Sequence, residues 1–202
     1  TILTVIQERG KQKKPIERVY KLLFNRELYL NAYAKLYPNN GAMTKGVTNE
    51  TVDGMSIQKI DRMIEILREE KYQWKPARRE YIKKKNGKKR PLGIPVWGDK
   101  VLQEVMRQIL EAYYEPQFSE HSHGFRPNRG CHTALQEIQV WKGTRWFIEG
   151  DISQYFDTID HKILLEILAR NIHDGRFIRL VSNMLEAGYL EEWKFKQTIS
   201  GV

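Results

Sequence analysis

The chain has 202 residues, and its hydrophobic (41%) and aromatic (11%) content is that of a globular protein with a sizeable core, which excludes a disordered chain. No apolar run approaches the ~20 residues that a membrane helix needs, so we expect no membrane partner. The single cysteine, Cys131, excludes an internal disulfide and fits a reducing, cytoplasmic location.

Basic residues are concentrated in the first half of the chain. Residues 1–100 hold 23 Lys and Arg against 11 Asp and Glu, a net charge of +12, whereas residues 101–202 hold 11 against 14, a net charge of −3. Clustered cations favour phosphates because binding releases counterions, so the basic half favours a nucleic-acid partner. An anionic membrane surface and a merely solvated face are the alternatives.

The first predicted elements are two amphipathic helices. Residues 8–15 are basic and predict irregular structure, and apolar side chains then recur at helical spacing from Ile16 until Pro38 ends the run. Residues 38–54 are rich in turn residues and predict a loop. Ser56 is placed to cap a second helix. The apolar face of that helix consists of Ile57, Ile60, Met63, Ile64 and Leu67.

Residues 80–96 predict a basic β-hairpin. Two short strand-like arms flank Asn86-Gly87, a pair that tolerates positive φ and so favours a tight turn. The cations of the hairpin are Lys83, Lys84, Lys85, Lys88, Lys89 and Arg90. An arginine offers a planar fork to phosphate oxygens and lysines add point charges, so this arm can hold a polyphosphate. The alternative is an exposed edge hairpin that lysines protect from aggregation.

The second half of the chain predicts further helices and one buried strand. Apolar periodicity indicates a helix that Pro116 closes, followed by a loop over residues 119–130 and another helical stretch. The apolar run WFIEGDI, residues 146–152, predicts a buried strand. Asp160 and Asp174 are placed to cap the last two helices.

Asp151, at the end of the predicted strand, is the main catalytic candidate. A strand-end aspartate is held on rigid backbone, and together with the carbonyl of Ile152 it offers the hard oxygen ligands that Mg²⁺ takes alongside substrate phosphates. Asp157 and Asp160 follow within nine residues. The alternative is that all three aspartates are turn and cap residues.

The segment HSHGFRPNRGCH, residues 121–132, is a further candidate site. Its histidines and its cysteine raise the idea of a zinc site, yet their spacing fits no closed zinc pattern well, and its glycines and proline favour a shaped loop. Arg126 and Arg129 are expected to contact backbone phosphates or the loop itself, with simple solvation as the alternative.

Four stretches resemble, in order, the sequence blocks of a reverse transcriptase of the group II intron-encoded kind, which also serves as an RNA maturase. TVDGMS resembles the N-terminal extra block, KKRPLGIP the first polymerase block and SHGFRPNRG the second. FIEGDISQYFDTIDH resembles the block that bears the first catalytic aspartate. Each block is short, whereas four in sequence over nearly the whole chain are specific.

This resemblance implies roles for single residues. Asp151 is implied to be catalytic and, with the Ile152 carbonyl, to hold Mg²⁺, while Asp157 belongs to the motif without being an expected ligand. Phe156 is implied to pack under the incoming sugar and to exclude a 2′-hydroxyl. Arg90 and a lysine across the hairpin, for which we take Lys83, are implied to hold the triphosphate. The implied reaction is two-metal phosphoryl transfer.

The resemblance implies an α+β fold that is a fragment of a right-hand polymerase. Residues 1–145 are expected to form helical fingers with the basic hairpin, and residues 146–202 part of a palm. The family's second metal-binding signature, an aromatic residue followed by Ala-Asp-Asp, does not occur in the sequence. Since the chain also begins at Thr1 rather than Met, we expect a piece of a longer protein that is inactive alone.

The implied partners are intron RNA, an RNA template, a DNA primer and deoxynucleoside triphosphates, and a homodimer stays open. The expected RNA contacts are Lys11, Lys13, Lys14, Lys84, Lys85, Lys88, Lys89, Arg126 and Arg129. A rival function is an RNA-binding splicing cofactor without polymerisation, which needs the basic surface but not Asp151. A two-metal nuclease would leave the hairpin and Phe156 without a role.

Overall fold

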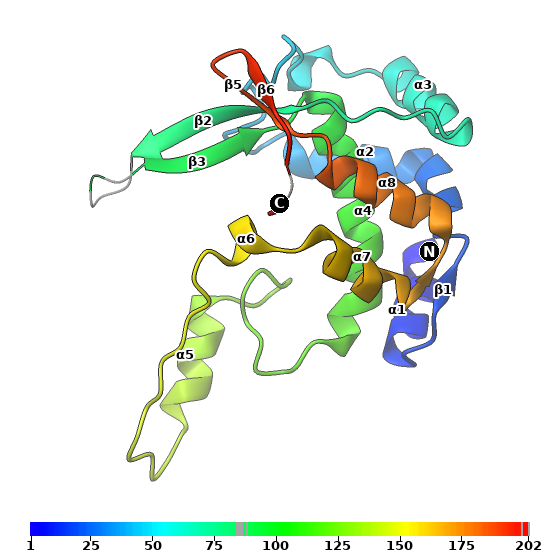
Figure 1. The fold of residues 1–202 in the computed structure, drawn as a ribbon. Helices are drawn as coiled ribbons and strands as arrows, with labels where there is room; N and C mark the ends of the chain where they lie inside the picture. Colours follow the sequence, from blue (N-terminus) through cyan, green and yellow to red (C-terminus); the bar gives the residue numbers. More distant parts are fainter. Residues whose placement is uncertain (84–86, 88, 199, 202) are drawn as a thin grey trace.

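The protein combines helices with two small sheets, and the computed structural model describes every residue except 84–86, 88, 199 and 202 (Figure 1). The α-helices are α1 Ile2–Lys11, α2 Arg26–Leu36, α3 Ile57–Arg68, α4 Trp97–Tyr114, α5 Cys131–Gln139, α6 Tyr155–Thr158, α7 His161–Ala169 and α8 Gly175–Leu185. The 3₁₀ helices are η1 Val19–Phe24, η2 Val52–Gly54 and η3 Glu115–Gln117. The strands are β1 Ile16–Glu17, β2 Ala77–Lys83, β3 Lys89–Ile94, β4 Ile172–His173, β5 Tyr189–Glu191 and β6 Lys194–Lys196. None of the described helices combines the length and the apolar character that crossing a bilayer would require.

Helix α4 forms the centre of the hydrophobic core, with α1 and α2 packed against it. Gly10 of α1 lies so close to α4 that an added Cβ would be 2.1 Å from the carbonyl oxygen of Tyr113. The Tyr113 hydroxyl in turn donates to the Lys14 carbonyl at 3.0 Å. The α4 side chains with no exposed surface are Val101, Leu102, Val105, Ile109 and Tyr113.

The beginning of the chain is tied to residues far along the sequence. Strand β1 pairs with β4 in parallel, with Ile16 opposite Ile172. The Ile16 N–H donates to the Asn171 carbonyl at 2.8 Å. From the loop after α3, the Trp74 indole N–H donates to the Leu180 carbonyl of α8 at 3.0 Å. Helix α8 therefore packs into the same core as the N-terminal elements.

The larger sheet has the strand order β3-β2-β5-β6, so the hairpin β2–β3 and the hairpin β5–β6 share one sheet. Strands β2 and β3 are antiparallel, whereas β2 and β5 are parallel, with Ala77 opposite Tyr189. The turn between β5 and β6 places Glu192 and Trp193 at φ values of 50° and 62°. Positive φ at both central residues matches the right-handed twist of the flanking strands.

Several predicted elements are confirmed. Ser56 caps α3 by accepting from the Lys59 N–H at 3.2 Å, and Asp160 caps α7 by accepting from the Ile163 N–H at 3.0 Å. Asp174 caps α8, and the predicted hairpin is present as β2 and β3. Gly87 of the predicted turn has φ +77°, while Asn86 lies outside the described residues.

One prediction for the N-terminal region is wrong in part and another is wrong. Residues 8–11, expected to be irregular, belong to helix α1, because Ile6 and Gly10 are buried against α4, whereas residues 12–15 are irregular as expected. The single long helix from Ile16 to Pro38 is instead β1, η1 and α2. Asn25 divides it, since its side chain accepts from the Glu27 N–H and so starts a new helix.

Helix α5 and the chain after it form an arm that projects away from the body of the protein at the lower left of Figure 1. None of the α5 residues is buried. All side chains of residues 141–158 are exposed, including several large apolar ones. The large apolar residues of this stretch are Trp141, Trp146, Phe147, Ile148, Ile152, Tyr155 and Phe156.

Candidate active site and nucleic-acid interface

The segment that carries Asp151 is extended and exposed. Residues 146–152, predicted as a buried strand, form no strand in the structure, and Phe147 and Ile148 are 69% and 93% exposed. A strand needs neighbours that pair with its backbone and cover its side chains, and no described strand pairs with this segment. The apolar pattern showed that the segment can be buried, but the prediction of a buried strand is wrong for this structure.

Asp151 and Ile152 are the residues expected to hold a magnesium ion. Both residues are exposed, so the carboxylate and the carbonyl are accessible to a ligand. Within the described residues, no group of three or more His, Cys, Asp or Glu side chains is arranged to hold a metal ion. Mg²⁺ is commonly held by one or two carboxylates together with substrate phosphates. The donors at Asp151 and Ile152 therefore fit such a partial site.

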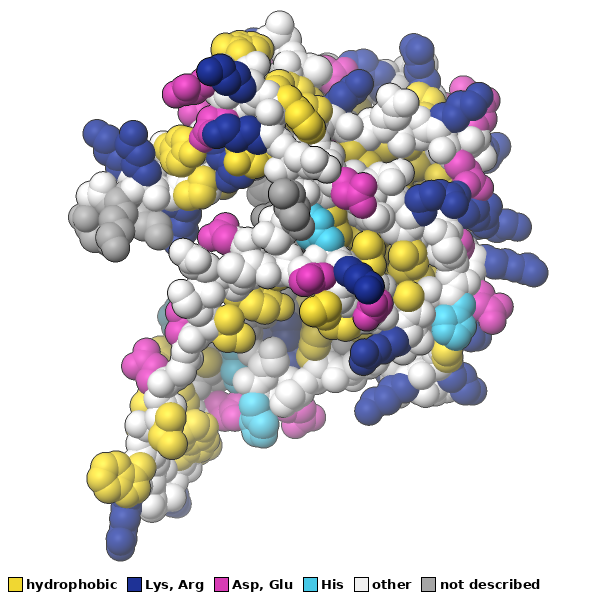
Figure 2. Space-filling view, in the orientation of Figure 1, with side chains coloured by type: hydrophobic (Ala, Val, Ile, Leu, Met, Phe, Trp, Pro, Cys, Tyr) yellow, Lys and Arg dark blue, Asp and Glu magenta, His cyan; other side chains and the backbone are white. Residues whose placement is uncertain are grey.

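Phe156 lies on the short helix α6, five residues after Asp151 in the chain. Its ring packs edge-on against Tyr155 with 5.3 Å between centroids and remains 57% exposed. Figure 1 shows α6 facing the β2–β3 hairpin across an open space, and Figure 2 shows the molecular surface hollowed on that side. The exposed ring is available to contact a ligand.

Residues near the end of the described chain contact α6, a relationship that the sequence analysis missed. The Gly201 N–H donates to the Ile159 carbonyl at 2.9 Å, and its carbonyl lies 2.7 Å from His161 Nε2. Gly201 has φ +85°, and an added Cβ would lie 2.9 Å from the Phe156 carbonyl oxygen. Glycine fits this position because it tolerates both the positive φ and the close approach. The Gly201 backbone therefore lies against α6 next to the Phe156 carbonyl.

The register of the hairpin separates Lys83 from Arg90. Arg90 lies opposite Ile82, whereas Lys83 lies opposite Lys89. Cross-strand partners share a face of a sheet, and successive residues point to opposite faces. Lys83 and Arg90 therefore leave opposite faces of the hairpin. The expectation that these two side chains hold one triphosphate together is therefore corrected. Of the two, only Arg90 lies on its face of the hairpin.

The cations at the outer end of the hairpin face solvent. Lys83, Lys89 and Arg90 are exposed, and the ion pair within the described part of this hairpin joins Arg78 to Glu80 at its base. The expected RNA contacts Lys84, Lys85 and Lys88 lie outside the described residues. Positive charge left without an acidic partner is available to phosphates.

Arg126 is an internal contact of the loop before α5, so its assignment to RNA is corrected. Its side chain is only 8% exposed. Its guanidinium donates to the Glu115 carboxylate at 2.9 and 3.0 Å and to the carbonyls of Ser119 and Ser122 at 2.6 and 2.9 Å. These hydrogen bonds use the donors of the guanidinium within the protein, so Arg126 is not available to bind a phosphate. Arg129 is half-buried and donates to the Glu120 carbonyl.

The two histidines of the same loop share one carboxylate on α5. His121 bonds to one oxygen of Glu137, and His123 Nε2 lies 2.8 Å from the other. His123 Nδ1 lies 2.8 Å from the Thr133 hydroxyl. These hydrogen bonds lower the pKa of Glu137. The histidines therefore fasten the loop to α5, which agrees with a shaped loop.

The N-terminal lysines lie at the end of α1 and just after it. Lys11 pairs with Glu8 at 2.7 Å. Lys13 and Lys14 are exposed, and Lys13 has φ +52°. The backbone of this turn is anchored to the core through the Lys14 carbonyl. These lysines therefore extend from fixed backbone.

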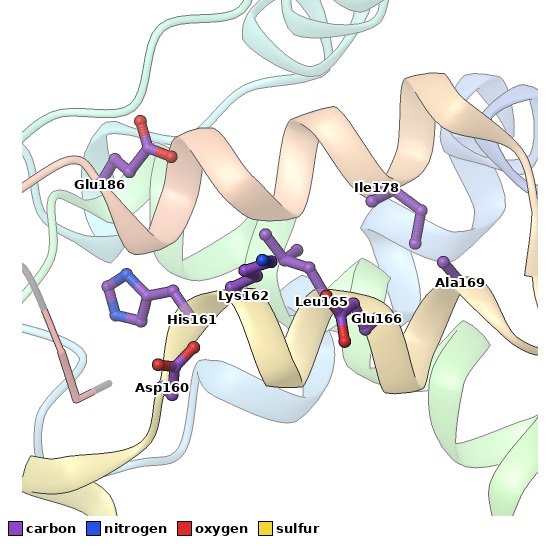
Figure 3. A pocket seen from close by; sticks show the side chains of 8 residues that line it. All are labelled: Asp160, His161, Lys162, Leu165, Glu166, Ala169, Ile178 and Glu186. Carbon is purple, nitrogen blue, oxygen red and sulfur yellow. The ribbon is translucent and has the colours of Figure 1, made fainter.

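A surface hollow between α7 and α8 lies outside the candidate residues (Figure 3). Its walls are Asp160, His161, Lys162, Leu165, Glu166, Ala169, Ile178 and Glu186. Asp160 is already used as a helix cap and His161 as a partner of Gly201. Neither Asp151 nor Arg90 lines this hollow, so we do not assign the chemistry to it.

Comparisons with known proteins identify relatives. The family described as reverse transcriptase (RNA-dependent DNA polymerase) matches residues 82–200, more than half of the chain. Group II intron-encoded protein LtrA of Lactococcus lactis subsp. cremoris is 49% identical over 186 residues, which cover 91% of this chain and 31% of that protein. An uncharacterized 91 kDa protein in the cob intron of Schizosaccharomyces pombe is 49% identical over 185 residues, which cover 91% of this chain and 23% of that protein.

A third relative is nuclear intron maturase 1, mitochondrial, of Arabidopsis thaliana, which is 36% identical over 93 residues that cover 46% of this chain and 13% of that protein. The chain thus spans less than a third of the length of these relatives. The matched region runs from Ile82, near the end of β2, through Asp151 and α6 to Ser200. The chain belongs to the reverse transcriptase (RNA-dependent DNA polymerase) family, and within it the chain is similar to group II intron-encoded proteins.

Proposed function

We propose that the full-length protein to which this chain belongs is an RNA-directed DNA polymerase of a group II intron that also binds intron RNA as a splicing maturase. The observation that carries the proposal is the family match over residues 82–200, which contain the hairpin cations, Asp151 and Phe156. The hairpin and α6 lie on either side of the hollow that Figure 2 shows. A template, a primer and a deoxynucleoside triphosphate are the ligands that such an arrangement serves.

In this proposal, residues 1–145 belong to the fingers of a right-hand polymerase and residues 146–202 begin its palm. Strand β5 of the palm part pairs with β2 of the fingers part, so the two parts share one sheet. The exposed apolar side chains of residues 146–152 support a palm strand that further residues of the protein would pair with and cover. Helix α8 also shares the hydrophobic core of the N-terminal elements. The proposed boundary at residue 145 would therefore separate two roles and not two separate cores.

The reverse transcriptase family requires a divalent metal ion in general, and we propose Mg²⁺ here. Asp151 and the Ile152 carbonyl would hold it. When bound, the ion supplies charge stabilisation at the reacting phosphate. Arg90 would orient the triphosphate through its planar fork of donors. Phe156, whose ring packs against Tyr155 and whose carbonyl lies next to Gly201, would fill the space that a 2′-hydroxyl needs.

RNA binding is proposed for the cations whose charge is exposed. These are Lys11, Lys13 and Lys14 near α1, together with Lys83 and Lys89 of the hairpin. Lys84, Lys85 and Lys88 remain in the proposal on the sequence alone, and Arg129 remains as a partly exposed loop residue. Phosphate contacts from such residues would position RNA without reading its sequence. We also propose that the protein can form a homodimer, which a measurement of its mass in solution would test.

A second candidate function is an RNA-binding splicing cofactor without polymerisation, which the name of the Arabidopsis relative favours. The two functions are separated by the full-length Asp151→Ala variant, assayed for primer extension and for splicing of its intron. Loss of extension with splicing retained supports a polymerase that is also a maturase. Retained extension would refute the assignment of Asp151, and a wild-type protein that splices but never extends a primer would favour the cofactor.

A further inference from the structure

One face of the four-stranded sheet interleaves aromatic rings with cations. Cross-strand partners share a face, so the registers β2–β3, β2–β5 and β5–β6 define which residues lie together. We name this surface the Tyr81 face. Its members are Arg79, Tyr81, Lys83, Lys89, Pro91, Tyr189, Glu191, Lys194 and Lys196. Arg90, Ile82, Leu92 and Phe195 lie on the opposite face.

The Tyr81 face carries a strong excess of positive charge. Its single acid, Glu191, already accepts from the Tyr81 hydroxyl and from Lys196, and these bonds lower its pKa. Lys83 and Lys89 lie directly opposite each other, an arrangement that destabilises a sheet. A polyanion bound across these lysines would remove that repulsion. Figure 2 shows cations grouped with apolar side chains over these strands.

The rings of this face are held in fixed orientations. Tyr81 is 50% exposed, and its hydroxyl is anchored to Glu191 on the neighbouring strand β5. The Arg79 guanidinium lies 4.0 Å above the centre of the Tyr189 ring, so both planar groups are fixed against each other. Planar groups set among cations are what single-stranded nucleic acid requires, because bases stack on the rings while phosphates contact the lysines.

We propose that the Tyr81 face binds a single-stranded RNA segment, with a base stacked on Tyr81 and phosphates at Lys194 and the neighbouring cations. The choice of RNA as the polyanion rests on the proposed function, whereas the surface itself rests on register, exposure and charge. Arg90 leaves the other face of the same hairpin. The hairpin would therefore hold a nucleotide on one face and an RNA strand on the other.

The test uses the full-length protein and fluorescence anisotropy with a short fluorescein-labelled oligouridine, which has no structure of its own. Tyr81→Ala removes the ring and is expected to weaken binding about 5- to 100-fold, the range for losing one stacked base. Tyr81→Phe keeps the ring and is expected to bind within about 2-fold of wild type. The matched control is Ile82→Ala, because Ile82 is 53% exposed on the adjacent position of β2 and points to the opposite face.

A second pair of variants tests the phosphate contacts. Lys194→Ala is expected to reduce the slope of log affinity against log salt by about 0.7, the value for one phosphate contact on a single strand. Lys162→Ala, which removes an exposed lysine of α7, is expected to leave that slope unchanged. If Tyr81→Ala unfolds the sheet, Lys194→Ala still tests the proposal, because Lys194 is an exposed residue on the edge strand β6.

Equal affinities for Tyr81→Ala and Ile82→Ala, with an unchanged salt slope for Lys194→Ala, would overturn the proposal. A second result would also overturn it: Tyr81→Ala that no longer binds phosphatidylserine vesicles but binds oligouridine as tightly as wild type. That result would assign the face to a membrane. Primer extension on a short primer–template by Tyr81→Ala reports separately on the polymerase. Suppose that primer extension is lost in Asp151→Ala but RNA binding is unchanged in Tyr81→Ala. This result would refute the inference and leave the proposed function intact.

Discussion

The Asp174 carboxylate accepts the backbone N–H of Tyr20 at 2.9 Å, across 154 positions of the sequence. Its other oxygen accepts from the Arg176 N–H at 3.2 Å, which caps α8. One buried side chain thus fixes both η1 and the start of α8. Asp174→Ala would leave the Tyr20 N–H without its acceptor and remove the cap, and we expect a loss of about 1–3 kcal/mol in the free energy of unfolding, measured by urea denaturation.

The matched control is Asp160→Ala. Asp160 caps α7 in the same way but is exposed and makes no comparable long-range bond among the described residues. We expect a loss of about 1 kcal/mol, the usual value for a helix cap. Equal losses for the two variants would show that the bond between Asp174 and Tyr20 contributes nothing measurable.

Arg126→Lys tests whether Arg126 serves the loop or RNA. A lysine cannot reproduce the fork that donates to Glu115 and to two carbonyls at once, so we expect a loss of about 1–3 kcal/mol in stability. Because the side chain is buried, the salt dependence of RNA binding should stay that of wild type. A reduced salt slope with unchanged thermal stability would restore Arg126 as a phosphate contact.

The network around Glu104 predicts a pH dependence of stability. Burial alone would raise the pKa of Glu104, but hydrogen bonds from Arg107 and Lys35 outweigh it, and the pKa lies below its ordinary value of 4.5. A lowered pKa in the folded state gives stability that is present above pH 4.5 and is lost as the pH falls through the lower folded value.

Glu104→Gln should therefore be less stable than wild type by about 1–3 kcal/mol at neutral pH. The difference should shrink as the pH falls below the ordinary glutamate pKa, because the wild-type carboxylate then becomes protonated. Thermal melting of both proteins from neutral to acidic pH measures it. A difference that does not change with pH would mean that the ionised carboxylate is not what stabilises this site.

Local patterns predicted the elements whose signals lie within a few residues. Helices α3 and α4 follow apolar periodicity, and the hairpin follows Asn86-Gly87 between two strand-like arms. The caps at Ser56, Asp160 and Asp174 were likewise readable, since a cap needs only the side chain and the next turn. The chemical block around Asp151 was found through resemblance, because three aspartates alone also fit turns and caps.

The errors concern features that depend on distant residues. Ile16 looked like the start of a helix, but it pairs with Ile172 in a strand. Helix α1 is apolar only in its first half and contains Gly10, a poor helix former, and it is held by packing on α4, which no local pattern reveals. Asn25 did offer a readable signal, since an asparagine before Arg-Glu is a typical helix start. The register of the hairpin was not readable, since a two-residue turn at Asn86-Gly87 would place Lys83 opposite Arg90, whereas the structure pairs Arg90 with Ile82.

Phe156→Ala tests the proposed selection of deoxynucleotides. Removing the ring opens the space beside α6 that a 2′-hydroxyl would occupy. We expect the preference of the full-length enzyme for deoxynucleotides over ribonucleotides, as a ratio of kcat/KM values, to fall about 10- to 100-fold. Tyr155→Ala is the matched control, and it should change the ratio less because it removes only the ring that supports Phe156. An unchanged ratio for Phe156→Ala would contradict the proposed contact with the sugar.

The most direct test of the account is primer extension by the full-length protein with Asp151→Asn, which keeps the shape of the side chain and removes its charge. Glu149→Gln, a neighbouring exposed acid in the same segment, serves as the control. We expect extension to fall by at least about 100-fold for Asp151→Asn, as for the loss of a group that stabilises charge in the transition state, and to stay near wild type for Glu149→Gln. Extension at the wild-type rate by Asp151→Asn would contradict the central claim.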